Sequence, residues 1–238
     1  RIMRELVIGI DSGTQSTKAL VVDVKNGKVL GEGTKSYGLI GGLPAGAKEQ
    51  DPSDWIKAAE SSVRTALKKA KARAVEVRAI GVSGQQHGFV PLDKKGNVIR
   101  PAKLWCDTST SKECDEIMEK LGGLKGSIKE IGNSVLPGFT AGKILWLKRN
   151  EPKNFNRLAT VLLPHDYLNF WLTGNTVMEY GDASGTALLN VRTRKWSKKI
   201  LKAIDARLES KMPKLISSDQ EAGKLTASTA KRLGLNSD

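Results

Sequence analysis

Residues 6–22 read LVIGIDSGTQSTKALVV, and this stretch decides how the chain folds. Leu6–Ile10 and Ala19–Val22 are apolar runs rich in β-branched residues, a composition typical of buried strands. A third such run, Val29–Glu32, follows an Asn-Gly pair, and Asn-Gly between two strand-like runs is a strong hairpin signal. The sequence therefore predicts three consecutive antiparallel strands at the start of the chain.

Helical and strand-like segments alternate in the rest of the chain. Asp51 and Pro52 have the residue types of a helix start, and apolar residues recur at helical spacing from Trp55 to Ala70. The sequence shows no repeat, low-complexity tract or linker, so the pattern indicates an α/β or α+β protein. Further helices are expected at 139–150, 165–172, 196–204 and 226–233, and further strands at 75–82, 160–163, 176–180 and 187–191.

The composition excludes several classes of protein. Hydrophobic residues make up 39% of the 238 residues, which is enough for a packed core. Lys or Arg interrupts every apolar run before the ~20 residues that a membrane span needs. Cys106 and Cys114 are the only cysteines, so the chain is neither a disulfide scaffold nor a Cys-rich zinc protein. Two cysteines fit a reducing compartment, and we expect a cytoplasmic protein.

The net charge of +14 raises the question of nucleic acid. The excess is dense at the end of the chain, where residues 190–238 hold 12 basic and 5 acidic residues. Nucleic-acid surfaces usually interleave such charge with stacking aromatic residues, and here only Trp196 lies in the basic run. A solvated helix face is therefore the favoured interpretation, and steeply salt-dependent DNA binding would argue against it.

The loop after the first strand is a candidate phosphate site. Gly13 tolerates positive φ, and backbone N–H groups together with short hydroxyls such as that of Thr14 are able to cradle phosphate oxygens. Asp11 would face a magnesium ion or its waters, because that metal takes carboxylates and keeps water. The loop is not a P-loop, since it lacks the Lys-Ser/Thr pair and a strand follows it. An ordinary polar hairpin turn is the alternative.

A candidate sugar site follows the strand expected at 75–82. Gln86 and His87 lie between two glycines and offer directional hydrogen bonds for hydroxyl groups. Trp105 and Asp107 add an apolar ring beside a carboxylate, which is the equipment of a sugar-binding pocket. The alternative is that His87 and Trp105 are ordinary core residues.

Three other polar features have simpler explanations. Asp166 follows His165 at a helix start, where helix capping accounts for it. Asp182 lies in a glycine-bounded loop and is interpreted as a turn residue. The two cysteines and His87 do not have the spacing of a metal site.

Taken together, these segments resemble the FGGY carbohydrate kinases, and among them the xylulokinases. The likeness runs from Leu6 to about Leu235 and departs from the pattern in two places. Gln86 stands where xylulokinases usually have Met, and Thr108–Thr110 stand where some bacterial relatives have Gly-Arg. The blocks that carry the resemblance are Ile10–Thr14, Glu49–Pro52 with Trp55, Ser83–Gly88, Leu104–Asp107, Pro137–Ala141, Leu163–Leu168 and Asp182–Thr186.

The resemblance implies an α/β fold of the actin-like ATPase (ribonuclease H-like) type, with a mixed five-stranded sheet flanked by helices. It implies that residues 1–238 form the N-terminal sugar-binding domain and that the C-terminal nucleotide-binding domain is absent from this chain. The general base would lie beyond Asp238, so the isolated chain is expected to be inactive. Loss of the partner domain would expose an apolar surface, through which the chain would associate with itself.

The resemblance also implies ATP-dependent phosphorylation of D-xylulose to D-xylulose 5-phosphate, with Mg²⁺. Gln86, His87, Trp105 and Asp107 would contact the ketopentose, Gly13, Thr14 and Gln15 would approach the phosphate, and Asp11 would organise the metal. Kinases for ribulose, gluconate or glycerol are alternatives within the family. A non-catalytic sugar-binding module is an alternative of another class.

Overall fold

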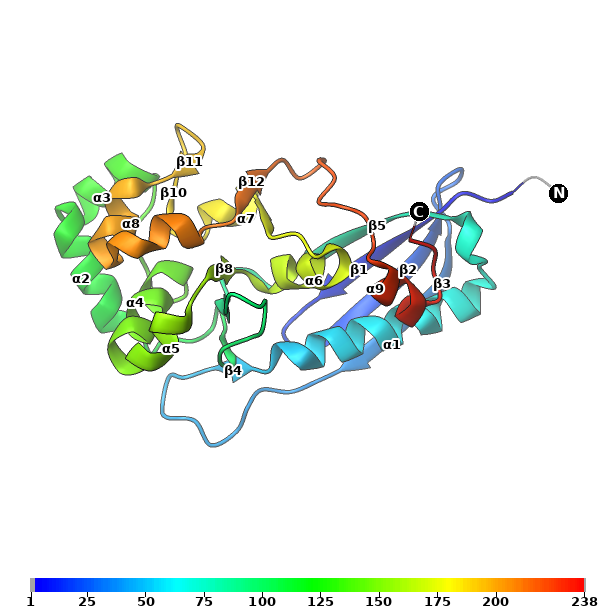
Figure 1. Ribbon diagram of the computed structural model, residues 1–238, viewed down its shortest axis with the longest axis horizontal. Helices are drawn as coiled ribbons and strands as arrows, with labels where there is room; N and C mark the ends of the chain where they lie inside the picture. The colour runs from blue at the N-terminus through cyan, green and yellow to red at the C-terminus, as the bar shows by residue number, and fades with distance from the viewer. Residues whose placement is uncertain (1–2, 238) are drawn as a thin grey trace.

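The computed structural model describes residues 3–237, and its central sheet has the strand order β3-β2-β1-β5 (Figure 1). β1 (Leu6–Ser12), β2 (Ser16–Asp23) and β3 (Val29–Ser36) are antiparallel neighbours, as the sequence predicts. β5 (Val77–Gly84) lies on the other side of β1 and runs parallel to it. The carboxyl ends of β1 and β5 therefore leave the sheet at the same edge.

Within the described residues this sheet has four strands, one fewer than the five expected. β9 (Val177–Glu179) and β12 (Lys214–Ile216) pair with each other in parallel and do not extend the sheet. β5 thus pairs with β1 alone, and a groove of about 960 Å³ runs along its outer side, from Val77 to Gly84. The outer backbone groups of β5 have no strand partner in the described part of the chain.

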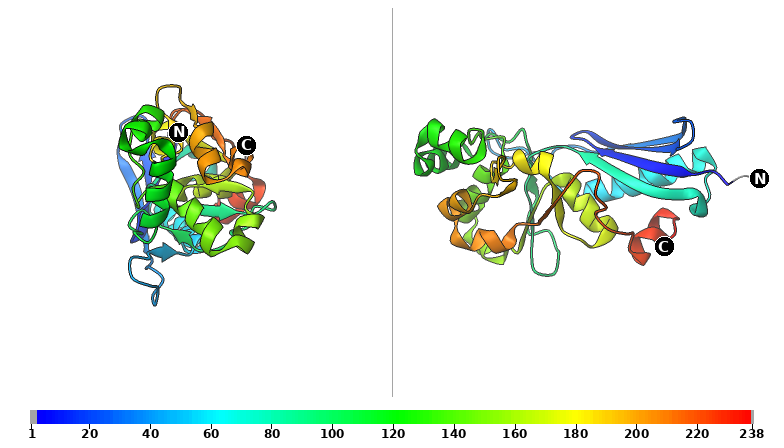
Figure 2. Two further views of the ribbon diagram at one scale, coloured as in Figure 1. Left: turned by 90° about the vertical axis from the view of Figure 1, so that its left-hand side faces the viewer. Right: turned by 90° about the horizontal axis from the view of Figure 1, so that it is seen from above.

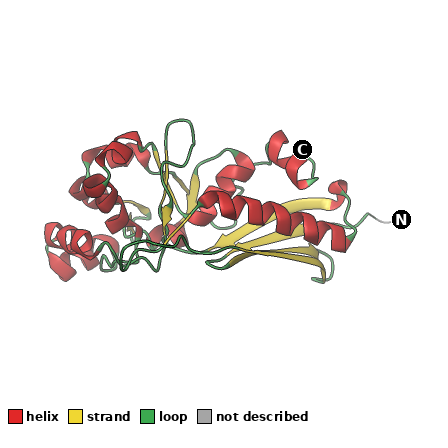
Figure 3. Cartoon of the chain, turned by 90° about the horizontal axis from the view of Figure 1, so that it is seen from below, coloured by secondary structure: helices red, strands yellow, loops and turns green. Residues whose placement is uncertain are grey.

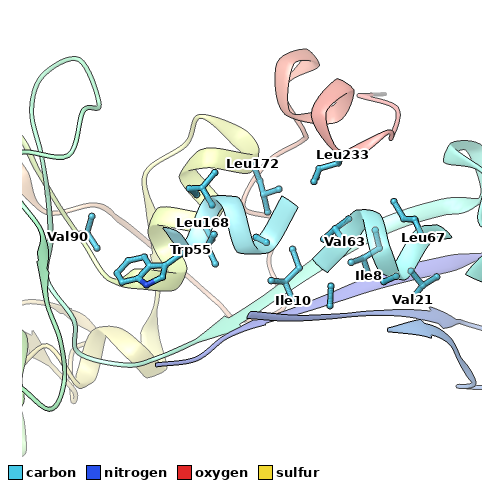
Figure 4. Packing of buried hydrophobic residues seen from close by; sticks show 14 of the residues in the cluster. Ile8, Ile10, Val21, Trp55, Val63, Leu67, Val90, Leu168, Leu172 and Leu233 are labelled. Carbon is cyan, nitrogen blue, oxygen red and sulfur yellow. The ribbon is translucent and has the colours of Figure 1, made fainter. Parts of the chain in front are cut away.

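Three helices lie on one face of the sheet, and the last of them packs on the other two (Figures 2 and 3). They are α1 (Pro52–Ala70), α6 (Pro164–Thr173) and α9 (Ala227–Leu233). Burial alternates along β1, because its even-numbered residues point at these helices. The resulting core is shown in Figure 4, where strand residues such as Ile10 face Val63, Leu168 and Leu233 from the three helices.

Two glycines of β3 let α1 approach the sheet closely. A Cβ at Gly31 would lie 2.1 Å from the carbonyl oxygen of Ala66, and a Cβ at Gly33 would lie 2.1 Å from that of Ser62. The helix begins as the sequence predicts, because the Asp51 side chain accepts a hydrogen bond from Ser53 N at 2.8 Å.

The opposite face of the sheet is open. Gly9, Asp11 and Ser83 are exposed there, and a Cβ built on Gly9 or Gly81 meets no described atom within 4 Å. The carboxylate that the sequence predicts as a metal ligand therefore lies on an accessible surface.

The other half of the chain is a mainly helical lobe with its own hydrophobic cluster, on the left of Figure 1. The cluster includes Ile117, Leu147 and Leu201, all buried. Three of its helices, α2, α3 and α5, were not expected from the sequence, and α5 begins at the proline that was predicted to end the preceding helix. The helices of this lobe are α2 (Ser111–Leu121), α3 (Gly123–Ile131), α4 (Thr140–Asn150), α5 (Pro152–Arg157) and α8 (Lys198–Ile204).

Short elements complete the described chain. No described helix is both long and apolar enough to cross a membrane. The paired strands are β4 (Glu49–Gln50) with β7 (Ala102–Lys103), β6 (Val90–Leu92) with β8 (Thr160–Leu162), and β10 (Leu189–Asn190) with β11 (Lys195–Trp196). The short helices are η1 (Ala74–Glu76), α7 (Tyr180–Ser184) and η2 (Ala206–Lys211).

Candidate functional site

The loop after β1 meets the segment after β5 and the segment that carries Trp105. Gln85 N donates a hydrogen bond to Ser12 O at 2.9 Å, which ties the two strand ends together. The Thr14 hydroxyl donates to Gln85 Oε1 at 3.3 Å and accepts from the indole nitrogen of Trp105 at 3.0 Å. The structure therefore joins the predicted phosphate loop to two predicted sugar-binding segments that are 71 and 91 residues away in sequence.

The loop between β1 and β2 is held by Tyr37, which the sequence analysis did not identify. The Tyr37 hydroxyl donates to Gly13 O at 2.5 Å, and Tyr37 N donates to Gln15 O at 3.0 Å. Gly13 does not have positive φ, so the freedom predicted for it is not what this loop requires. Gln15 is exposed, and Thr14 is partly exposed.

Asp11 lies one residue before the end of β1, on the open face of the sheet. It stands in register with Lys18 of β2 and Ser83 of β5, and Lys18 pairs with Glu32 at 3.4 Å. No ion pair to Asp11 occurs among the described residues. A single accessible carboxylate suits Mg²⁺, which usually keeps several waters and also binds substrate phosphates. No group of three or more His, Cys, Asp or Glu side chains that could hold a metal occurs in residues 3–237.

A buried amide network fixes the position of Gln85. Gln50 Oε1 accepts hydrogen bonds from Gln85 Nε2 and from Trp55 Nε1, both at 2.9 Å. Gln50 Nε2 in turn donates to Thr14 O at 2.6 Å. The sequence predicts no role for Gln85, and Gln50 lies only in a segment of family resemblance. Their contacts are between distant segments, so no local pattern reveals them.

His87 is half-buried just beyond β5 and has a φ of 61°, in the left-handed region. Its ring packs edge-on against Phe139 at a centroid distance of 4.8 Å, and its carbonyl accepts the Thr140 hydroxyl at 2.9 Å. Gly185 lies against the other part of the ring, since a Cβ there would come within 2.3 Å of His87 Cε1. Phe139 and Gly185 thus contact the ring on two sides, and Thr140 anchors the backbone that carries it.

Burial and the nearby ammonium of Lys143 lower the pKa of His87, although Asp182 acts in the opposite direction. His87 is therefore neutral at pH 7. Its Nδ1 is buried and has no hydrogen-bond partner, which leaves Nε2 as the ring nitrogen able to contact a ligand. A neutral imidazole is able to donate or accept a hydrogen bond from a hydroxyl group.

Gln86 and Trp105 are accessible. The Gln86 side chain is exposed, and Trp105 is 44% exposed although its indole N–H is bonded to Thr14. An exposed tryptophan face beside polar groups is suited to pack on the carbon skeleton of a sugar.

Asp107 is buried, and its oxygens are occupied by donors of the chain itself. Oδ2 accepts from Lys48 N at 2.9 Å and Lys103 Nζ at 3.0 Å, and Oδ1 accepts from Ser109 N and Oγ at 2.9 and 2.6 Å. Burial would raise the pKa of Asp107, but these bonds outweigh it and the pKa is lowered. In this structure Asp107 braces the segment beneath Trp105, and a sugar contact would require it to give up one of these partners.

Lys143 is a buried cation that the sequence analysis missed. Its ammonium donates to the carbonyl oxygens of Pro137, Gly138 and Phe139 at 3.2, 2.6 and 3.0 Å. Burial is the main reason why the pKa of Lys143 falls to about 8. Lys143 thus holds the segment that places Phe139 against His87. A lysine among the buried positions of a helix is the signal that would have identified it.

The groove along β5 is separate from this group of residues. Ser83, Gly84 and Asp182 line it, whereas Thr14, His87 and Trp105 do not. The candidate site is therefore the surface around the junction of Thr14, Gln85 and Trp105, and Gln86 and His87 are the next two residues along the chain from Gln85.

Comparison with known proteins gives consistent results. The model of the FGGY family of carbohydrate kinases, N-terminal domain, matches residues 6–238. A xylulose kinase of Haemophilus influenzae is 41% identical over 237 residues, which are 97% of this chain and 48% of that protein. The chain spans about half the length of the curated relatives it matches.

Solved structures agree with the sequence comparison. The structure of a xylulose kinase from Rhodospirillum rubrum has a TM-score of 0.89 and 27% identity, covering 98% of this chain and 47% of that one. A gluconate kinase from Lactobacillus acidophilus also has a TM-score of 0.89, with 26% identity, 99% coverage of this chain and 46% of that one. Backbone shape alone therefore does not separate these two substrates. Because the family model matches all but the first residues, this chain belongs to the FGGY family of carbohydrate kinases and corresponds to their N-terminal domain.

Proposed function

We propose that this chain is the sugar-binding half of an enzyme that transfers the γ-phosphoryl group of ATP to the terminal hydroxyl of D-xylulose, giving D-xylulose 5-phosphate. The observation that supports the proposal is the junction of Thr14, Gln85 and Trp105, which links the proposed phosphate loop to segments of the proposed sugar site. Transfer of a phosphoryl group asks a protein mainly to position the reactants and to stabilise charge.

On the sugar side, the proposed contacts come from Gln86, His87 and Trp105. Trp105 packs on the carbon chain, while Gln86 and Nε2 of His87 exchange hydrogen bonds with hydroxyl groups. Asp107 joins this set if it exchanges one of its internal partners for a sugar hydroxyl, and otherwise it supports Trp105.

On the phosphate side, Gly13, Thr14 and Gln15 would approach the transferred group of ATP, and Asp11 would hold Mg²⁺ or its waters. The metal supplies positive charge that offsets the charge of the phosphates. We assign the general base to a segment outside this chain, together with the nucleotide-binding domain, because no residue here matches the family segment that supplies it. The relatives are about twice as long as this chain, which supports this assignment.

Binding of D-xylulose to the 238-residue chain, measured by calorimetry without ATP, tests the sugar site. Gln86→Ala weakens binding about fivefold through the loss of one hydrogen bond, and His87→Ala abolishes it. Gln220→Ala is a matched control because Gln220 is also exposed and does not belong to the candidate site. Equal affinity of the His87→Ala chain would remove His87 from the site.

The same titration with D-ribulose, gluconate and glycerol separates xylulose from the family alternatives. Two curated relatives that are 41% and 39% identical to this chain are xylulose kinases, so we expect xylulose to bind most tightly of the four. Tighter binding of gluconate would instead favour a gluconate kinase, like the solved structure from Lactobacillus acidophilus. Xylulose-dependent release of ADP by this chain alone would show that the general base lies within it.

A further inference from the structure

His165 lies between two carboxylates, and all three groups line the groove along β5. Its Nε2 is 3.0 Å from Asp166 Oδ1, and its Nδ1 is 3.0 Å from Asp182 Oδ2. Nδ1 makes no hydrogen bond of acceptable geometry, so the pair with Asp182 is held mainly by charge. Only 7% of the His165 side chain is exposed.

Helix capping explains only part of this arrangement. Asp166 Oδ2 accepts a hydrogen bond from Leu163 N at 2.9 Å, as a capping residue should. Its other oxygen faces His165. Asp182 is not the loop residue expected from the sequence either, because it belongs to α7 and contributes a charge to His165.

The two carboxylates keep His165 positively charged. Burial alone would lower the pKa of His165, but attraction to Asp166 and Asp182 outweighs it and raises the pKa to about 10. The pKa of Asp182 is correspondingly lowered, in spite of its burial, by His165. An uncompensated charge at this depth would be costly, so the three groups stabilise one another.

α7 connects this cluster to His87. Asp182 begins the turn that ends at Gly185, and Gly185 packs against the His87 ring. On the other side, His165 abuts the end of β5, since a Cβ at Gly84 would lie 3.1 Å from His165 Cβ. His165 therefore lies between the strand that leads to His87 and the turn that packs on its ring. The left-handed backbone of His87 needs such support.

We propose that His165 is a positioning residue, which as a cation between Asp166 and Asp182 holds the α7 turn against His87 and so orients the imidazole that contacts the sugar. The statement that His87 contacts the sugar rests on the proposed function. The statement that His165 orients the His87 ring does not depend on it. His165→Gln removes the charge, while His165→Lys keeps it.

NMR of the histidine rings tests the proposal directly, because His87 and His165 are the only histidines of the chain. In His165→Gln the single remaining ring signal belongs to His87, and we expect it to shift and broaden as the ring loses its support. In His165→Lys the His87 signal stays at its original position. Asn169→Ala, also in α6, is the control and leaves both signals unchanged. An unchanged His87 signal in His165→Gln would overturn the proposal.

Xylulose affinity provides the second readout. His165→Gln weakens binding about tenfold and His165→Lys restores it, because residues of one network couple at about this level. If His165→Gln and His165→Lys weaken xylulose binding equally, the charge of His165 does not matter and the proposal is wrong. If the unaltered chain does not bind xylulose, the proposed function fails while the ring spectrum still decides the role of His165. If His165→Gln does not fold, Asp166→Asn carries the same test, since an amide oxygen is still able to accept from Leu163 N while one of the two charges that face His165 is removed.

Discussion

Lys143 and His165 are two buried cations on different sides of His87, and their surroundings shift their pKa values in opposite directions. Lys143 is bonded to three neutral carbonyl oxygens, so burial dominates and its pKa falls to about 8. His165 faces two carboxylates, which outweigh burial and raise its pKa to about 10. The direction of each pKa shift is therefore decided by whether fully charged carboxylates face the cation, and not by the number of its hydrogen bonds.

Replacing Lys143 by methionine should raise the pKa of His87. The Lys143 ammonium is one of the two causes that lower this pKa, and methionine removes the charge while it fills a similar volume. An NMR titration of the His87 ring measures the change. Lys148→Met removes a lysine from the same helix that pairs with Asp205 instead, and should leave the pKa of His87 as it is. A fall of this pKa in Lys143→Met would contradict the electrostatic explanation.

The two cations also predict an unusual dependence of stability on pH. The contribution of His165 is complete below pH ~6.5 and is lost as pH rises through about 10, since folding raises its pKa. Folding lowers the pKa of Lys143 to about 8. Between that pH and ~10.5 the unfolded chain holds the proton more tightly than the folded chain, so the contribution of Lys143 to stability increases with pH. Between pH 8 and 10 the two slopes oppose each other.

Urea unfolding of Lys143→Met should therefore show a steeper loss of stability above pH 8 than the unaltered chain. With the Lys143 term removed, the slope for one proton is about 1.4 kcal/mol per pH unit. His165→Gln removes the His165 contribution, which falls with pH. The free energy of unfolding of this variant should therefore increase as the pH rises from 8 to 10. Parallel curves for the three proteins would show that these groups do not titrate as the structure indicates.

At the scale of elements, the contact between α1 and β3 depends on the absence of two side chains. Gly31 and Gly33 each face a backbone carbonyl of the helix, and backbone atoms cannot move aside as a flexible side chain does. The helix therefore lies closer to the sheet than any residue with a Cβ would allow.

Gly33→Ala should destabilise the chain by about 3 kcal/mol, because its Cβ would overlap the Ser62 carbonyl. Gly9→Ala is the matched control within the same sheet, since its Cβ would enter open space, and it should change stability by about 0.5 kcal/mol or less. Urea unfolding measures both. A Gly33→Ala chain as stable as the control would mean that α1 can move away from β3 without loss.

At the scale of the whole molecule, the sheet half and the helical lobe bury separate hydrophobic clusters. Leu201→Ala, in the helical cluster, should cost about 2–5 kcal/mol. Hydrogen exchange followed by mass spectrometry should then show faster exchange in α2, α4 and α8 than in β1 and β2. Equal acceleration in both halves would show instead that they unfold as one unit.

The sequence predicts the sheet strands and α1 because their signals are local. The apolar, β-branched run of β1, the Asn-Gly turn and the Asp51 cap all depend on neighbouring residues. α2 and α3 escaped prediction, since Gly122 and Gly123 interrupt a stretch with few apolar residues.

The candidate site was predicted only in part. Three of its residues stand out in the sequence, because polar or aromatic side chains follow directly on apolar strand-like segments there. They are Gln86, His87 and Trp105. Its supports do not, since Gln50 binds Gln85 across 35 residues and His165 acts on a different element. Such partners become visible only when the chain is folded.

The hydroxyl of Thr14 carries one hydrogen, which the structure directs at Gln85, while its lone pair accepts the indole of Trp105. A phosphate oxygen that claims this hydrogen leaves the Gln85 carbonyl without a donor, and the amide must turn or recruit water. In the proposed enzyme, an anion bound at this loop would therefore be felt at Gln85, and by thermodynamic reciprocity a sugar bound beside Gln85 would alter how readily the loop takes an anion. The Thr14 hydroxyl would then couple the proposed phosphate and sugar sites.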